Sequence, residues 1–412
     1  MRILQINNFE DIRGGSDRVY QLTTRMLLDR GHEVATVACG DTSFEERKRS
    51  ILLPPNGYFS ANPVSTLKNI GQFIYRPATA KQVRELVQTF RPEIAHLHIF
   101  YGQLSSSILK ALNDLKVPCI MTVHEYRMLC PISTMYTQPQ GVCERCAGGS
   151  VRHAVTHRCN RNSVLASGLS ALEAWVRDRE FSYLSHIDHF LMVSEFCRNK
   201  HIEHLPEIRG KSSVLYNFVA DRDIASSPTN IAADAPFLYA GRISHEKGVH
   251  LLCEAFSKRP HLGLRIAGSG PLADDLIRDY ANSPNIVFLG KLESVQLKKE
   301  LASAKFSIVP SEWYENNPMA ILESFGVGTP VLGSCIGGIP ELVIVGETGL
   351  QFPPSNLDLL LAALDAAAEI SPIERDRMGK NAISLIQARH TESAYYEKLM
   401  CGYQTAISHR HP

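Results

Sequence analysis

The sequence contains no apolar run of the roughly eighteen residues that a membrane-spanning helix needs, so we expect no transmembrane segment. Residues 1–7 are too short and too polar for a signal peptide, which favours a cytoplasmic protein. The chain also lacks an excess of charge, because 43 basic and 42 acidic residues leave a net charge of +1. This balance argues against a dedicated nucleic-acid-binding protein, and any anion site must be local.

Short internal repeats and low-complexity tracts are absent as well. Of the 412 residues, 44% are hydrophobic and 21% are charged, as in ordinary soluble globular proteins. This length exceeds the size at which one hydrophobic core usually keeps growing, so we expect two domains with a cleft between them. The ten cysteines are spread through apparent strands and helices, which fits reduced thiols better than a small disulfide scaffold.

The first half of the chain alternates between predicted strands and helices. Strands are expected at 3–6, 33–38, 93–98 and 118–124. This order predicts a parallel, doubly wound sheet, in which ligands collect at the carboxyl ends of the strands. We therefore expect Gly14, Gly15 and His124 to face one crevice of a domain that covers residues 1–217 and carries a cysteine-rich insertion at 130–160.

After a loop-rich stretch, the alternation of strands and helices begins again. Buried strands that meet a glycine are predicted at 237–241, 264–268, 286–290 and 331–333. This pattern predicts a second doubly wound sheet in a domain that covers residues 218–390.

The most informative feature is a pair of glutamates, Glu315 and Glu323, which are separated by seven residues. A strand is predicted at 306–310, and Pro318 at a first helical position, with Asn317 as its N-cap, predicts a helix. The first turn of a helix exposes unpaired N–H groups and a partial positive charge, which suits a phosphate. The two carboxylates could therefore hold opposite ends of an elongated polar ligand.

A second strand-to-helix loop carries two cations, Arg242 and Lys247, after Gly241. Arginine can bind phosphate oxygens in bidentate fashion and lysine provides a compact charge, so together they could stabilise a departing diphosphate. A solvated basic loop is the alternative. Gly14 and Gly15 are similarly ambiguous, because a glycine pair forms a turn with positive φ or lets a phosphate approach the backbone.

Three other features allow two interpretations each. His124 at a strand end is a structural histidine or a ligand contact. The run 268–273 loosely matches a dinucleotide fingerprint, but the next strand lacks the acidic residue at its tip, so a glycine turn that admits a ligand or a helix is simpler. A long amphipathic helix expected between 163 and 194, with Arg177 and Arg179, packs on the first domain or rests on a membrane surface.

The insertion contains four cysteines in a C-x12-C-x2-C-x12-C pattern, at Cys130, Cys143, Cys146 and Cys159. The central pair has the spacing of a metal knuckle, so a tetrahedral structural zinc that folds the insertion is one interpretation. Four free thiols are the other interpretation. His153 or His157 could also replace an outer cysteine as a ligand.

Taken in order, these motifs resemble the family 4 retaining glycosyltransferases of the GT-B fold, over nearly the whole chain. The segments that carry the resemblance are Gly14–Gly15, Thr122–Glu125, Val193–Glu195, Gly241–Gly248, Gly268–Pro271, Glu315 with Glu323, Gly328–Val331, Gly337–Glu341 and Gly346–Leu350. The resemblance implies two Rossmann-like domains that face a cleft, with the acceptor side at 1–217 and the nucleotide-sugar side at 218–390. It also implies a terminal helix within 391–412 that packs back on the first domain.

The resemblance further implies roles for the charged residues. Glu315 would contact the donor sugar and Glu323 the ribose hydroxyl groups. Arg242 and Lys247 would contact the diphosphate, and His124 would lie near the reacting carbon of the sugar.

Donor binding would involve the backbone as well. Groups around Asn316, Asn317 and Pro318 would hold sugar hydroxyls and phosphate, although the family often has a glycine and a phenylalanine before this proline. Gly14, Gly15, Gly241 and Gly268 complete the donor-binding set that we expect.

The implied reaction transfers a sugar from a nucleotide-sugar co-substrate to a hydroxyl group of a glycan or lipid-linked glycan, with retained anomeric configuration. Such enzymes commonly act in bacterial exopolysaccharide, O-antigen or lipopolysaccharide synthesis, at the inner face of the cytoplasmic membrane, and peripheral membrane contact would fit. The resemblance implies that no metal is needed for the chemistry, so the metal that remains possible is a structural zinc in the insertion. The alternatives are a catalytically silent nucleotide-sugar-binding protein and an NAD-dependent oxidoreductase that uses the glycines at 268–270.

Overall fold

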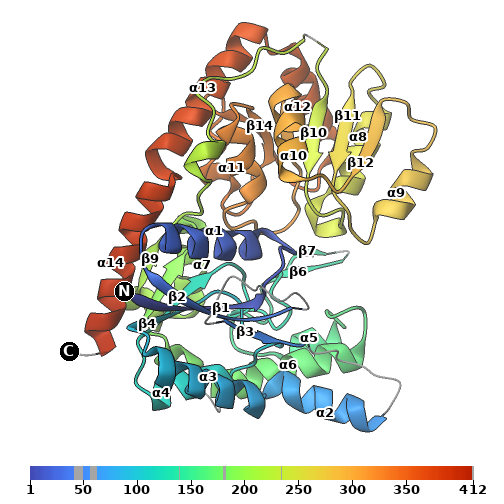
Figure 1. The fold of residues 1–412 in the computed structure, drawn as a ribbon. Helices are drawn as coiled ribbons and strands as arrows, with labels where there is room; N and C mark the ends of the chain where they lie inside the picture. The colour runs from blue at the N-terminus through green and yellow to red at the C-terminus, as the bar shows by residue number, and fades with distance from the viewer. Residues whose placement is uncertain (41–49, 56–62, 139, 180–181, 233, 411–412) are drawn as a thin grey trace.

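The computed structural model describes residues 1–40, 50–55, 63–138, 140–179, 182–232 and 234–410. They form two α/β units, one above the other, and the C-terminal helices run along one side of both (Figure 1).

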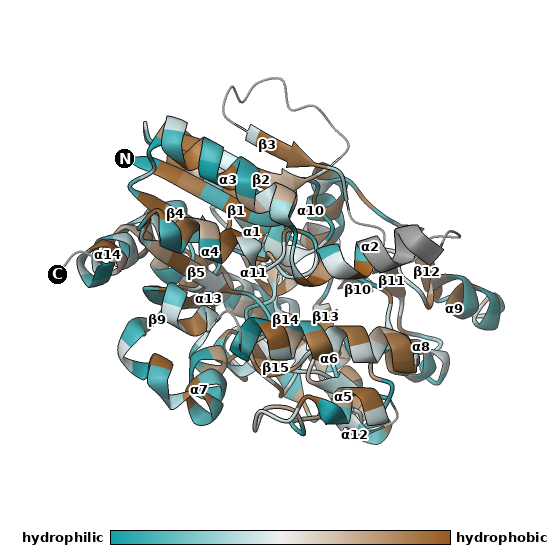
Figure 2. Cartoon of the chain, turned by 90° about the horizontal axis from the view of Figure 1, so that it is seen from below, coloured by the Kyte–Doolittle hydropathy of each residue, from teal (hydrophilic) through white to brown (hydrophobic). Residues whose placement is uncertain are grey.

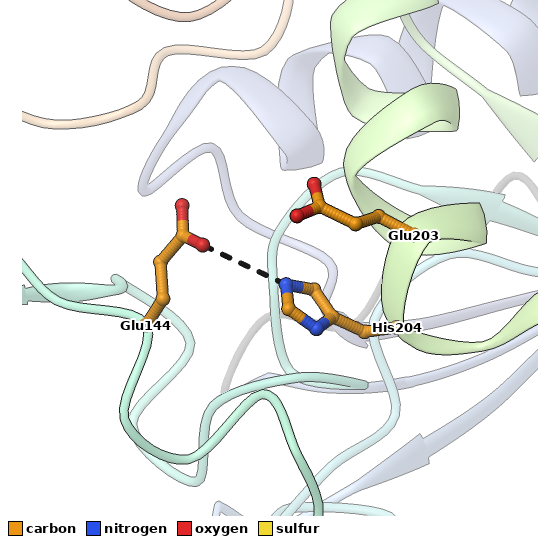
Figure 3. A group of neighbouring side chains, drawn as sticks. All are labelled: Glu144, Glu203 and His204. Atoms are coloured by element: carbon orange, nitrogen blue, oxygen red, sulfur yellow. Dashed lines mark ion pairs between the residues drawn. The ribbon is translucent and has the colours of Figure 1, made fainter.

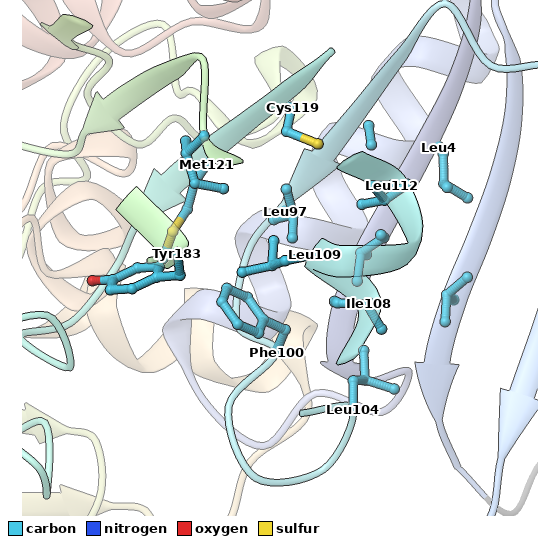
Figure 4. Packing of buried hydrophobic residues seen from close by; sticks show 14 of the residues in the cluster. Leu4, Leu97, Phe100, Leu104, Ile108, Leu109, Leu112, Cys119, Met121 and Tyr183 are labelled. Carbon is cyan, nitrogen blue, oxygen red and sulfur yellow. The ribbon is translucent and has the colours of Figure 1, made fainter. Parts of the chain in front are cut away.

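The first unit is built on a parallel sheet with the strand order β3-β2-β1-β4-β5-β8-β9. Its strands are β1 (Arg2–Phe9), β2 (Glu33–Cys39), β3 (Ser50–Leu53), β4 (Ile94–Leu97), β5 (Cys119–Val123), β8 (His189–Met192) and β9 (Ser212–Val214). The helices are α1 (Gly15–Asp29), α2 (Pro63–Ile74), α3 (Pro77–Phe90), α4 (Ser107–Asp114), α5 (Arg152–Thr156), α6 (Val164–Arg179) and α7 (Glu195–His204). In the core, Leu97 and Met121 of the sheet belong to the same buried cluster as Ile108, Leu109 and Leu112 of α4 (Figure 4).

The second unit has its own parallel sheet with the order β12-β11-β10-β13-β14-β15. Its strands are β10 (Phe237–Ala240), β11 (Leu264–Ala267), β12 (Ile286–Gly290), β13 (Ser307–Val309), β14 (Val331–Ser334) and β15 (Gly349–Phe352). The helices are α8 (Val249–Ser257), α9 (Ala273–Asp279), α10 (Ser294–Ser303), α11 (Met319–Gly326), α12 (Leu357–Glu369) and α13 (Pro372–Arg389). This arrangement confirms the prediction of two doubly wound, Rossmann-like sheets.

The chain returns to the first unit at its C-terminal end. Helix α14 (Glu392–Arg410) buries Tyr395, Leu399 and Tyr403 in an apolar cluster with Ile3 and Ile120 of the first sheet. The chain passes from the first unit to the second after β9 and returns between α13 and α14. These two connections contact each other, because the His390 ring is hydrogen bonded to the Asn217 carbonyl group at 2.8 Å. The first unit is therefore completed by the last helix of the chain (Figure 1).

The long helix expected between residues 163 and 194 is present as α6, but it does not extend to the end of that range. Helix α6 ends at Arg179, and the 3₁₀ turn at Tyr183–His186 leads into strand β8. The apolar run of β8 pairs with β5, so tertiary pairing overrides the helical pattern there.

Of the two interpretations of this helix, contact of Arg177 with a membrane surface is excluded because the residue is buried. Its guanidinium group is only 1% exposed, because it forms ion pairs with Glu173 at 3.1 Å and Asp178 at 3.0 Å. In contrast to Arg177, two apolar residues of α6 are exposed to solvent: Leu165 is 77% exposed and Trp175 is 45% exposed. Figure 2, which views the molecule from below, shows hydrophobic residues along this helix. In the described part of the chain, no helix is both long and apolar enough to cross a bilayer.

Candidate functional site

Glu315 and Lys247 form an ion pair beside the start of helix α11. The Lys247 Nζ lies 2.6 Å from the Glu315 Oε1, and the Ser311 hydroxyl group donates to the same oxygen at 2.6 Å. Glu315 is 6% exposed, and burial alone would raise the pKa of its carboxyl group. The Lys247 charge and the hydrogen bonds from Lys247 and Ser311 outweigh burial and lower this pKa. Glu315 is therefore a carboxylate at neutral pH.

Arg242 lies in the loop after β10, where its exposed side chain lines a cavity of about 460 Å³. The other lining residues come from the first unit and include Gly14, Asp17 and Glu125. Among the residues that the structure describes, no ion pair or hydrogen bond engages the Arg242 guanidinium group. This cation is thus available to a ligand that lies between the two units.

The glycines after β11 shape the Arg242 loop. A Cβ atom on Gly268, whose φ is +151°, would lie 1.8 Å from the Gly241 carbonyl oxygen, and one on Gly270 would lie 2.2 Å from the Ile243 oxygen. Glycine is required at both positions because the backbone of the neighbouring loop fills this space. The element that approaches Gly268 is therefore the Gly241 backbone. This packing gives no support to a dinucleotide-binding fingerprint at 268–270.

A second glycine pair holds the backbone of Glu315. A Cβ atom on Gly337 would lie 2.2 Å from the Glu315 carbonyl oxygen, and one on Gly338 would lie 1.8 Å from the Asn316 oxygen. The Gly338 N–H group donates to the Glu315 carbonyl group at 2.7 Å. This glycine pair therefore positions Glu315, a role that the sequence signals only through the two adjacent glycines.

Glu323 is bridged to the first unit by Arg18 of helix α1. The Arg18 Nη1 lies 2.8 Å from the Glu323 Oε1, and burial raises the pKa of this carboxyl group although Arg18 lowers it. Helix α11 begins at Met319, and Pro318 occupies its N-cap position without a side-chain cap. The expectation that Asn317 caps this helix is therefore wrong by one residue.

The two asparagines between Glu315 and Pro318 connect the units. Asn316 Nδ2 donates to the His124 carbonyl group at 2.8 Å. Asn317 accepts from the Asn217 N–H group through its side chain at 2.9 Å, and its carbonyl group accepts from the Asn217 side chain at 2.8 Å. Both side chains are therefore used to fix the first unit against the donor-side loop.

His124 follows β5 and is half-buried at the end of a chain of imidazoles, in which His96 and His98 are fully buried. His98 Nε2 lies 3.0 Å from the Gln5 Oε1, which can only accept, so this nitrogen donates. The His98 Nδ1 must then accept from His124 Nε2 at 2.9 Å. Burial lowers the pKa of His124 to about 3, so its imidazole is neutral and offers only Nδ1, as an acceptor.

The buried histidines predict a stability that falls in acid. Burial lowers the pKa of His96 and of His124 to about 3, whereas a histidine in the unfolded chain titrates near 6.5. Below that pH only the unfolded chain binds the proton, so each such residue removes about 1.4 kcal/mol of stability per pH unit until the folded pKa is reached. Urea unfolding between pH 7 and 5 measures this slope. We expect the slope of unfolding free energy against pH to be smaller by about one bound proton in a His96→Gln variant. An unchanged slope would contradict this expectation.

Gly14 and Gly15 lie at the start of helix α1. Gly14 is the N-cap residue with extended backbone, and neither glycine has the positive φ of a glycine turn. No atom lies within 4 Å of a Cβ placed on Gly14, whereas one on Gly15 would lie 3.6 Å from the Met319 side chain. The space beside Gly14 opens on the cavity that Arg242 lines.

The four cysteines of the insertion line one small cavity together with His153 and His157. All four are free thiols. Burial, together with the neighbouring Cys130, Cys159 and Cys143, raises the pKa of Cys146 to about 12. The fold therefore brings the sequence-distant thiols of the predicted metal site together.

Two Rossmann-like units that enclose a carboxylate, two cations and a helix N-terminus define a protein of the GT-B fold class. Residues 13–222 match the family model described as Glycosyltransferase Family 4, and residues 221–385 match the model described as Glycosyl transferases group 1. The first match covers half of the chain, so the protein belongs to the glycosyltransferases that these models describe.

Individual relatives agree with this family. A glycogen synthase of Mycobacterium tuberculosis is 38% identical over 138 residues, which are 32% of this chain and 33% of that protein. A lipopolysaccharide 1,2-N-acetylglucosaminetransferase of Salmonella typhimurium is 29% identical over 223 residues, which are 49% of this chain and 58% of that protein. The chain thus spans about a third of the first relative and less than two thirds of the second.

A solved structure has the same fold over nearly its whole length. The crystal structure of Anabaena Alr3699/HepE in complex with UDP and glucose superposes with a TM-score of 0.67 and 16% sequence identity. The match covers 97% of this chain and 98% of that one. At this identity the likeness establishes the GT-B fold alone.

Proposed function

We propose that the protein transfers a sugar from a nucleotide-sugar donor to a hydroxyl group of a glycan or lipid-linked glycan, with retention of anomeric configuration. The observation that carries this proposal is the pair of Lys247 and Glu315 at the start of helix α11, with Arg242 exposed to the cavity between the units. Cations and a helix N-terminus stabilise a leaving diphosphate, while a carboxylate stabilises positive charge on the reacting sugar.

The proposed mechanism needs no base from the protein. His124 is a neutral imidazole with a pKa of about 3, too low for a general base at neutral pH. The bond between the anomeric carbon and the diphosphate oxygen breaks, and the acceptor oxygen bonds to the carbon on the same face. The acceptor proton passes to the departing diphosphate oxygen, whose charge Arg242 and Lys247 stabilise. His124 Nδ1 accepts from a hydroxyl group of the donor sugar.

The acceptor occupies the cavity of about 460 Å³ in this proposal. Its lining includes the carboxyl groups of Asp17 and Glu125 and the Arg127 side chain, which is ion paired with Glu173. Helix α6 lines the same cavity and exposes Leu165 and Trp175 to solvent. A lipid-linked acceptor fits this arrangement, because its sugar can enter the cavity while its lipid meets the apolar residues at a membrane surface. Flotation with lipid vesicles tests the contact, and a protein found only in the soluble fraction contradicts it.

The experiment that tests the transfer itself is a screen of nucleotide-sugars. Mass spectrometry of nucleotide release identifies the donor base and sugar, with the UDP-sugars tested first because a solved neighbour of the same fold holds UDP. We expect release to require an acceptor and to need no added divalent metal. Donor binding without transfer or hydrolysis would instead support a catalytically silent nucleotide-sugar-binding protein.

Replacement of Glu323 by glutamine tests the ribose end of the donor site. The change removes one charge-assisted hydrogen bond, worth about 1.5–3 kcal/mol, to a ribose hydroxyl group. We expect the KM for the donor to rise about 10- to 100-fold while kcat changes little. Steady-state kinetics measure both constants, and an Arg18→Gln variant reports the effect of losing the ion pair alone. A large fall in kcat at unchanged KM would contradict the assignment.

A further inference from the structure

The insertion at 130–160 has little regular structure to hold its conformation. It contains the hairpin of β6 (Tyr136–Thr137) and β7 (Gly141–Val142) and the short helix α5. Its Met135 and Ala147 share a small buried apolar cluster with Tyr126 and Leu129, which precede the insertion. Segments with so small a core usually need a disulfide or a metal to hold one conformation.

The backbone of the insertion is also strained close to the first cysteine. Ser133 and Met135 have φ angles of 64° and 48°, and Arg158, next to the last cysteine, has a φ of 49°. A left-handed conformation costs a non-glycine residue about 1–2 kcal/mol. Such residues persist only when their surroundings hold them there, and the apolar cluster is too small to do so by itself.

The thiols lie where a cross-link would be useful. Cys130, Cys143, Cys146 and Cys159 line one cavity, although they come from the two ends and the middle of the insertion. In the described part of the chain, the sulfur atoms of these cysteines do not form a group in which all lie within 4.8 Å of one another. Around one zinc ion, four sulfurs are about 3.8 Å apart. A zinc ion bound by all four would therefore require the sulfurs to lie closer together than they do in this structure.

We propose that Cys130, Cys143, Cys146 and Cys159 bind one structural zinc ion, which fixes the insertion against the donor-side loop. Binding replaces four S–H protons, which pass to solvent, with four Zn–S bonds. The tetrahedral ion joins the two strained ends of the insertion to its central knuckle.

The knuckle itself reaches the catalytic loop. Glu144 lies between Cys143 and Cys146, and its Oε1 accepts from the Tyr314 hydroxyl group at 2.8 Å. A second bond runs from the Tyr136 hydroxyl group to the Glu312 Oε2 at 3.1 Å. Tyr314 immediately precedes Glu315, so the insertion bridges the two units next to the proposed site. Zinc would therefore act as a positioning element for Glu315.

A different group of ligand types lies beside the knuckle. The carboxylates of Glu144 and Glu203 and the ring of His204 have ligand atoms within 4.8 Å of one another (Figure 3). Lys200 Nζ already contacts Glu144 at 3.0 Å and Glu203 at 2.9 Å. Its charge compensates both carboxylates, so this group is an ion-pair network on α7 that anchors Glu144.

Metal analysis of the purified full-length protein tests the zinc site without any assay of transfer. We expect about one zinc per chain, lost in Cys143→Ser and Cys146→Ser and retained in the matched controls Cys335→Ser and Cys401→Ser, which change exposed cysteines elsewhere. Cobalt in place of zinc should give thiolate-to-metal charge-transfer absorption. Folded protein that contains no zinc and does not bind added zinc overturns the proposal, as does a disulfide between these cysteines.

The ligand set has its own test. Cys130→Ser and Cys159→Ser should lose the ion, whereas His153→Ala and His157→Ala should retain it. Loss in a histidine variant, with retention in either outer-cysteine variant, overturns the four-thiol assignment.

The link to Glu315 is tested by hydrogen exchange at 311–318, which does not depend on transfer. We expect chelation of zinc to speed exchange in this segment, and Tyr314→Phe to speed it in the zinc-loaded protein. When zinc removal and Tyr314→Phe are combined, the increase in exchange rate should not exceed the larger of the two separate increases, because both changes break the same bridge. We also expect zinc chelation and Tyr314→Phe to lower kcat/KM for sugar transfer by a similar factor. This kinetic expectation rests on the proposed function. Unchanged exchange after complete zinc removal would overturn the link and leave the proposed transfer intact.

Discussion

Replacement of Lys247 by alanine should lower the turnover of sugar transfer by about 10²- to 10³-fold, the usual cost of removing one preorganised electrostatic contact to a transition state. Lys247 Nζ lies 2.6 Å from Glu315, and it is one of the two cations proposed to stabilise the leaving diphosphate. The variant also leaves a buried carboxylate with Ser311 as its remaining neutral donor. Because burial then dominates, the pKa of Glu315 should rise from its lowered value.

The measurements that check this result are kcat from nucleotide release and the free energy of unfolding. Lys258→Ala, which removes an exposed lysine of a helical ion pair, is the matched control and should leave both nearly unchanged. The double variant Lys247→Ala with Glu315→Gln should recover part of the stability lost in Lys247→Ala, because it removes the unpaired charge. Normal turnover in Lys247→Ala would show that the diphosphate lies elsewhere.

Replacement of Glu315 by glutamine should lower turnover about 10²-fold or more while the fold is retained. Glutamine has nearly the same shape and keeps an oxygen that can accept from Ser311, which donates to Glu315 at 2.6 Å. It lacks the negative charge that would stabilise positive charge on the reacting sugar, so the loss should appear in kcat rather than in the KM for the donor.

The pH dependence adds a second criterion for Glu315. Its pKa is lowered in the folded protein, so the carboxylate form is complete at neutral pH and is lost only as the pH falls through this lowered value. Its protonation should therefore not limit turnover between pH 6 and 8. Near-normal transfer by both Glu315→Gln and Lys247→Ala would exclude this pair from catalysis.

The order of strands and helices could be predicted from the sequence because each element has a local signature. Apolar runs that end at glycine identify the strands β10, β11 and β12, and the structure has them there. The end of the helix expected between 163 and 194 could not be predicted, since a short apolar run such as that of β8 looks alike in a helix and in a buried strand. Pairing of β8 with β5 decides between them, and that pairing is not local.

The candidate site could be predicted only in part. The residue types at Arg242, Lys247 and Glu315 indicate phosphate and sugar chemistry, but their partners lie far away in the sequence. Glu315 is 68 residues from Lys247, and Asn316 is 192 residues from His124. The positioning contacts of Arg18, His98 and Ser311 carry no motif, so only the structure reveals them.

Spacing and residue type are short-range properties, so the two parallel sheets, the loops that carry charge and the resemblance to a glycosyltransferase family could be predicted without the structure. Three other facts are visible only in the folded protein: the Gly241 backbone packs against Gly268, Arg177 is buried, and four thiols share a cavity. Those facts depend on which surfaces meet when the chain folds. The free energy of a charged or small residue is set by the atoms around it, and these come from distant parts of the chain.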